Sequence, residues 1–178
     1  MPRDRLKIMV SSTVYGSESD LDQIKATLES FEYDVVMSKD GDIYVPMDDK
    51  NEDACIKAVD DCDLFFGIIF PRYGSGITHK EFLRAINQDK PMWFACHYTV
   101  EYTRKLMKQF MFDANGKRVG FDIQPTSVLD SLKVVDMYND VRHKWVQPFM
   151  KTPEILHFVN NQFKDMQRRK EELQNRSL

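Results

Sequence analysis

Residues 64–70 read LFFGIIF, an apolar run without a polar side chain. Its length is that of a β-strand, and a strand without polar alternation is typical of one that is buried on both faces. Such strands occur in the centre of parallel sheets, where connecting helices cover both sides. The run therefore predicts an α/β fold, provided that helices alternate with further strands along the chain.

The sequence around this run has that alternation. The strand-like segments are 7–10, 34–37 and 91–96, and the segments with apolar residues at helical spacing are 19–31, 51–62 and 78–88. This order predicts right-handed crossovers and a doubly wound, mostly parallel sheet of about five strands with helices on both faces. We expect the last strand, 145–149, at an edge of the sheet because it contains Pro148.

The rest of the chain is expected to be helix-rich from residue 99 onward. Helices are predicted over 100–112, 127–138 and 153–174. An aromatic-rich stretch is expected to pack into the core, because aromatic side chains mostly bury their area. It comprises Tyr98, Tyr102, Phe110, Phe112 and Phe121.

Length and charge limit the classes of protein and partner. A chain of 178 residues fits one domain, here 1–178, and a net charge of −3 gives no general attraction to nucleic acid or anionic membranes. The N-terminus lacks the apolar run of a signal peptide, so we expect a cytoplasmic protein. The three cysteines, Cys55, Cys62 and Cys96, have no metal-ligand spacing and are expected to be buried, reduced thiols.

Two loops are candidates for a binding site, because ligands of open parallel sheets bind beyond the carboxyl ends of the strands. The first, 11–16, contains Ser11, Ser12, Thr13 and Tyr15 before a helix. Their hydroxyls, with backbone amides leading into that helix, suit a phosphate or a ribose. Ordinary turn and capping chemistry is an equally good explanation.

The second loop, 71–81, is richer in functional groups. It contains Arg72, Tyr73, Gly74, Ser75, His79 and Glu81. A carboxylate in the first turns of a helix at this rim could stabilise positive charge at the anomeric carbon of a sugar. However, Thr78-x-x-Glu81 before an apolar run is also a capping-box pattern, and the spacing alone favours that structural role.

Several segments together resemble a known family. They are VSSTVY at 10–15, DLFFGII at 63–69, RYGS at 72–75, Thr78-x-x-Glu81-Phe82 and Lys90-Pro91. Over residues 6–96 they resemble a domain of unknown function that often precedes NLR-like NTPase modules. That family is similar to TIR domains and to nucleoside deoxyribosyltransferases, which share a flavodoxin-like fold and use a glutamate at a ribosyl centre. One departure is Gly16, where the family usually has an aspartate.

The resemblance implies a function. Glu81 would be the catalytic residue of a TIR-like enzyme that cleaves the nicotinamide–ribose bond of NAD and releases ADP-ribose or a cyclic form as a signal in antiviral defence. The substrate-binding residues would be Ser11, Ser12, Thr13, Tyr15, Arg72, Tyr73, Gly74, Ser75 and His79. NAD would be the substrate, with no other cofactor and no metal.

Two alternatives stay open at this point. One is an enzyme that acts on nucleosides or nucleotides, a glycosidase or deoxyribosyltransferase with Glu81 as nucleophile. The other is a module without catalysis that recognises a ligand or partner. A separate effector protein that senses the product and self-association of the chain are further expectations.

Overall fold

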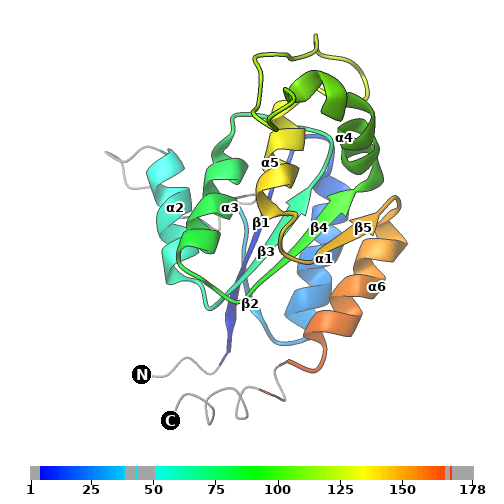
Figure 1. Ribbon diagram of the computed structural model, residues 1–178. Coiled ribbons are helices and arrows are strands. Elements are labelled where there is room, and N and C mark those ends of the chain that lie inside the picture. The colour runs from blue at the N-terminus through cyan, green and yellow to red at the C-terminus, as the bar shows by residue number, and fades with distance from the viewer. Residues whose placement is uncertain (1–4, 39–42, 44–50, 167–168, 170–178) are drawn as a thin grey trace.

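The computed structural model describes residues 5–38, 43, 51–166 and 169, and its centre is an all-parallel sheet of five strands in the order β2-β1-β3-β4-β5. The strands are β1 (Lys7–Ser12), β2 (Asp34–Val36), β3 (Leu64–Ile69), β4 (Met92–His97) and β5 (Val146–Phe149). The helices are α1 (Glu18–Ser30), α2 (Asn51–Asp61), α3 (Ile77–Asn87), α4 (Tyr98–Met111), α5 (Lys133–Val141) and α6 (Thr152–Phe163). The predicted doubly wound α/β fold is confirmed (Figure 1).

The position of β3 follows from its sequence. Every residue of this strand is buried, and it pairs with β1 on one side and β4 on the other. At one edge lies β5, where Pro148 has only one strand beside it. Both results confirm the sequence predictions, because an all-apolar strand needs cover on two faces and a proline is tolerated at an edge.

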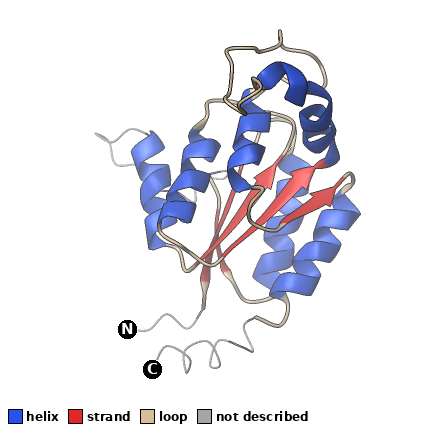
Figure 2. Ribbon diagram, in the orientation of Figure 1, coloured by secondary structure: helices blue, strands red, loops and turns tan. Residues whose placement is uncertain are grey.

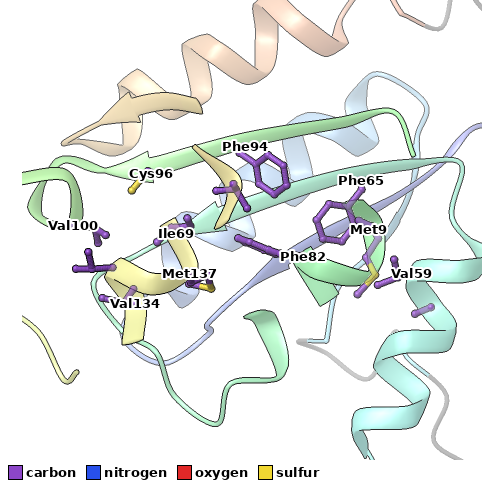
Figure 3. Close-up of a cluster of buried hydrophobic side chains, with 14 of the residues drawn as sticks. Met9, Val59, Phe65, Ile69, Phe82, Phe94, Cys96, Val100, Val134 and Met137 are labelled. Carbon is purple, nitrogen blue, oxygen red and sulfur yellow. The ribbon is translucent and has the colours of Figure 1, made fainter. Parts of the chain in front are cut away.

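Two layers of helices enclose the sheet (Figure 2). Side chains alternate between its faces, so that Met9 and Phe65 belong to one core cluster while Ile8 and Phe66 belong to the other. The first cluster lies under α2, α3, α4 and α5, and the second under α1 and α6. Figure 3 shows the first cluster, where aromatic and aliphatic side chains from the strands and helices gather.

A glycine in β3 sets how closely α3 approaches the sheet. A Cβ at Gly67 would lie 2.6 Å from the Phe94 ring and 2.8 Å from the Phe82 ring. These two rings therefore fill the space that a side chain at position 67 would need. Because Gly67 has no side chain, α3, which carries Phe82, can pack directly over β3 at this position.

Three predicted boundaries differ from the structure. The first strand continues through Ser11 and Ser12, because both pair with β3 in the sheet. The helix predicted over 127–138 begins only at Lys133. The Thr126 hydroxyl accepts the backbone N–H groups of residues 128 and 129, and Asp122 accepts that of residue 132, which holds this segment in turns. The final helix ends at Phe163, and most of its predicted continuation lies outside the described residues.

The prediction that the aromatic stretch is core is wrong for several of its members. Tyr102 is 54% exposed and Phe110 is 50% exposed, and Phe121 is exposed as well. The reason is that α4 buries only Val100 and Met111. The exposed rings pair locally instead, Phe110 with Phe121 at 5.6 Å between ring centres.

No helix in the described part of the chain combines the length and apolar character needed to cross a bilayer.

Candidate functional site

The pair Ser11 and Glu81 is buried where β1 meets α3. Ser11 follows Met9 at the alternate position of β1, so its side chain faces the same helical layer. Its hydroxyl donates a hydrogen bond to Oε2 of Glu81. The exposed fractions of the two residues are 1% and 2%. The pair is thus polar, although the buried residues around it in β1 and α3 are mostly apolar.

The capping-box explanation of Glu81 is wrong. The N-cap of α3 is Gly76, with φ 85°, and no side chain caps the helix. Because the helix begins at Ile77, Glu81 lies two positions beyond N3, the position from which a capping-box glutamate bonds the N-cap amide. Its carboxylate instead bonds Ser11 across the sheet, so helix capping does not explain why an acid is buried here.

The surroundings of Glu81 perturb its ionisation. Burial raises the pKa of the carboxyl above its ordinary value, and the Ser11 hydroxyl and the neighbouring Cys55 thiol lower the pKa in part. Burial and the neighbouring Glu81 carboxylate in turn raise the pKa of Cys55 to about 12. Among the described residues, no donor lies within hydrogen-bonding geometry of Glu81 Oε1, which is buried. An unpaired buried oxygen is costly, so the fold alone does not account for it.

The loop between β3 and α3 is held by a carboxylate from a distant segment. Asp130 accepts the backbone N–H of Tyr73 at 2.9 Å and that of Gly74 at 3.2 Å. Gly74 has φ 63°, and a Cβ there would lie 3.2 Å from Thr13 Cγ2. The loops after β1 and β3 therefore touch, as expected for neighbouring parallel strands that end at the same edge.

A chain of hydrogen bonds runs along the outer side of this loop. The hydroxyl of Tyr73 lies 3.1 Å from Nδ1 of His79, and Nε2 of His79 lies 2.7 Å from a carboxylate oxygen of Asp140. Burial is the main cause that raises the pKa of Tyr73. The carboxylate fixes the imidazole, and the imidazole in turn orients the phenol, so the three side chains act as one unit.

A pocket of about 480 Å³ opens at the carboxyl edge of the sheet. Tyr15 and Arg72 line it, together with His97 at the end of β4 and Lys151 before α6. Tyr15 is 77% exposed, and Arg72 donates a hydrogen bond to the carbonyl of Ser127 at 3.3 Å. Burial lowers the pKa of His97, which favours its neutral form. Cationic groups and a phenol at a strand-end pocket suit an anionic ligand with a ring.

The predicted site residues fall into three groups in the structure. Ser11 and Glu81 form the buried pair, Tyr73 and His79 belong to the hydrogen-bonded chain, and Tyr15 and Arg72 line the pocket. Of the remaining four, Ser12 is buried in β1 with its hydroxyl toward the Thr13 carbonyl, Thr13 and Gly74 are in contact, and Ser75 is exposed. The buried pair does not line the pocket.

Sequence reasoning missed three residues that support these groups, namely Cys55, Asp130 and Asp140. The sequence did indicate that Cys55 faces the core, because it lies on the apolar face of α2 with Ala58 and Val59. Nothing in the sequence indicated a role for Asp130 or Asp140, because they come from the part of the chain without recognisable motifs. Within the described residues no cluster of three or more potential metal ligands occurs.

Comparison with known proteins gives a family without an assigned activity. No curated protein matches the chain. A family model matches residues 7–175, a span that includes the strands, the helices and the two loops at the sheet edge. The chain therefore belongs to the family described as Domain of unknown function (DUF4062).

Proposed function

We propose that this protein is a TIR-like enzyme that cleaves the N-glycosidic bond between nicotinamide and ribose in NAD. The observation that carries the proposal is the buried Glu81 at the carboxyl edge of the sheet, with Oε2 held by Ser11 and Oε1 without a partner in the described residues. When Glu81 is ionised, such an oxygen places negative charge in a low-dielectric setting, where it stabilises a developing cation best.

In the proposed reaction the bond between C1′ and the nicotinamide nitrogen breaks, and nicotinamide leaves with the bonding electron pair. Glu81 stabilises the oxocarbenium-like ribosyl centre. Water then attacks C1′ and loses a proton to solvent, which gives ADP-ribose. Attack by a nitrogen of the adenine instead gives a cyclic product.

The pocket supports the binding of such a substrate. Arg72 and Lys151 would pair with the diphosphate, and Tyr15 offers a ring for stacking. Because Glu81 is almost fully buried, the side chains over it must move apart before a ribosyl centre reaches Oε1. Release of a signal in antiviral defence is the further part of the proposal that rests on the likeness to TIR domains.

The decisive experiment compares two variants in an assay of nicotinamide release from NAD, with nucleosides and nucleotides as parallel substrates. Glu81→Gln keeps an acceptor for Ser11 but removes the charge, so we expect turnover to fall about 100-fold or more. Glu29→Gln makes the same chemical change on the exposed surface of α1 and should retain full activity. Equal turnover in Glu81→Gln and wild type contradicts the proposal.

A second function is favoured by one specific observation, the separation of the buried pair from the pocket. In a recognition module without catalysis, Glu81 would only join β1 to α3, and the pocket would bind a ligand or partner. This alternative gives no turnover of any of these substrates, and loss of ligand binding in Arg72→Gln but not in Glu81→Gln would support it.

A further inference from the structure

A second pocket, of about 910 Å³, lies between α4, the turn that follows it and the C-terminal end of α5. None of the residues assigned to the proposed reaction lines it. Its volume lies within the usual range of about 300–1,000 Å³ for sites that bind small organic ligands. What it binds is therefore a question separate from the reaction proposed above.

The lining of this pocket is strongly basic. Arg104, Lys105 and Lys108 come from α4, and Arg142 comes from the end of α5. Arg104 and Lys108 are four positions apart, so like charges share one face of the helix, which costs stability in isolation. An anion between the two helices would remove this repulsion.

Little acidic charge opposes these cations. Lys105 pairs with Glu101 at 2.8 Å, but Lys108 and Arg142 form no ion pair within the described residues. The single carboxylate of the lining, Asp113, already accepts two backbone N–H groups of its own turn, those of residues 115 and 117, at 2.9 Å each. Helix dipoles favour Lys108 and Arg142 at helix ends. They do not explain Arg104, which lies in the middle of α4.

An unpaired donor gives independent evidence for a ligand. Nε of Arg104 donates to Oδ1 of Asn139 at 2.6 Å, and only an oxygen can accept that bond, so the orientation of the amide is fixed. The other atom of the amide, Nδ2, is buried and has no acceptor among the described residues. Asn139 lines the pocket, so a shift of its side chain would bring the orphaned donor to the same partner that the cations favour, an acceptor with negative charge.

We infer that this pocket binds an organic phosphate of nucleotide size. Phosphate oxygens accept several charge-assisted hydrogen bonds at once, which matches two guanidinium groups, an ammonium group and an amide. Phe112 and Leu106 supply apolar lining for the organic part. The cations are gathered in one pocket of a protein with a net charge of −3, so a small ligand fits better than a nucleic acid.

The test is isothermal titration of the full chain with ADP and with inorganic pyrophosphate at low and high salt. Arg142→Gln and Asn139→Leu should each weaken ADP binding about tenfold or more, the usual effect of losing a hydrogen bond to a charged group. Asn139→Leu removes the orphaned donor and also the acceptor of Arg104 Nε, so a thermal melt must show that the variant is folded before its ADP binding is compared. Lys57→Gln, on exposed α2, should bind ADP as wild type does.

Three results would overturn the inference. The first is no saturable binding of either compound at concentrations up to about 1 mM. The second is ADP binding that Arg72→Gln abolishes while Arg142→Gln and Asn139→Leu leave it unchanged, which would place the nucleotide at the sheet edge. The third is binding of single-stranded oligonucleotides that tightens with their length and exceeds that of ADP.

Discussion

The hydroxyl of Ser11 donates a hydrogen bond to the carboxylate of Glu81, 70 positions further along the chain. The contact exists because β1 and β3 are neighbours, so the helix that leaves β3 crosses back over β1. One side chain comes from the sheet and the other from the helix, and both are buried. The pair therefore couples the ionisation of a single carboxyl to the packing of α3 on the sheet.

This coupling predicts how stability depends on pH. The pKa of Glu81 is raised in the folded protein above the ordinary value of 4.5, so the folded state binds more protons than the unfolded state between the two values. Glu81 thus contributes most to the stability of the folded state below pH 4.5, and this contribution is lost as the pH rises through the folded-state pKa. As the pH rises through this range, we expect the free energy of unfolding of wild type to fall by on the order of 1–3 kcal/mol relative to that of Glu81→Gln.

Urea denaturation of both proteins between acid and mildly alkaline pH measures this difference. Taking the difference removes the other titrating groups, such as Asp60 and Glu154, whose lowered pKa values act in the opposite direction. Glu29→Gln, on exposed α1, serves as the control and should follow wild type. A constant difference between wild type and Glu81→Gln would show that burial does not perturb this carboxyl.

The fold was largely predictable because its strongest signals are local. The unbroken apolar run of β3 identified the central strand, and Pro148 identified the edge. The errors came where a side chain far away decides the structure. Asp122 accepts the backbone N–H of Leu132 and so delays the start of α5. Ser11 stays in the sheet because it pairs with Gly67 of β3. Neither interaction can be read from the sequence near these residues.

A matched pair of glycine substitutions tests the close packing of α3. Gly67→Ala places a methyl group within 2.8 Å of the Phe82 and Phe94 rings, so we expect it to lower the free energy of unfolding by about 1–3 kcal/mol. At Gly120 a Cβ meets nothing within 4 Å, and Gly120→Ala should be neutral or stabilise by up to about 1 kcal/mol. Urea denaturation compares them, and equal stabilities would mean that the rings yield without cost.

Asp130 should control the order of the loop that carries Tyr73 and Gly74. Asp130→Ala removes the acceptor of both amides, so hydrogen exchange at these two positions should become faster and stability should fall by about 1–2 kcal/mol. Exchange measured by mass spectrometry or NMR tests this. Asp34→Ala removes an exposed carboxylate at the start of β2 and should change neither amide. Unchanged exchange in Asp130→Ala would mean that other contacts hold the loop.

The site was less predictable than the fold for the same physical reason. The motifs drew attention to the two loops, and the structure places these loops in contact at Thr13 and Gly74. They could not show that Glu81 is buried away from the pocket, because burial depends on how α2 and α3 pack. Nor could they identify Asp130 or Asp140, since an acidic residue in a loop has no local pattern that names its partner.

Cys55 offers a direct measure of access to Glu81. Its thiol is buried beside the carboxylate, and its pKa, raised to about 12, leaves almost no reactive thiolate at neutral pH. Cys62 and Cys96 are buried too, and burial raises the pKa of each. We therefore expect a thiol reagent to label the native protein slowly and to label all three cysteines at once after unfolding in urea.

The same thiol tests whether substrate opens the site. If NAD reaches Oε1 of Glu81, the side chains around it must separate, and labelling of Cys55 should change on addition of NAD while labelling of Cys96, buried in β4, should not. Peptide mass spectrometry separates the two rates in one sample. Arg72→Gln, with its weakened pocket, should require more NAD for the same effect. Rapid labelling of Cys55 without NAD would mean that the carboxylate is already accessible, and an unchanged rate at saturating NAD would mean that the nucleotide never reaches Glu81.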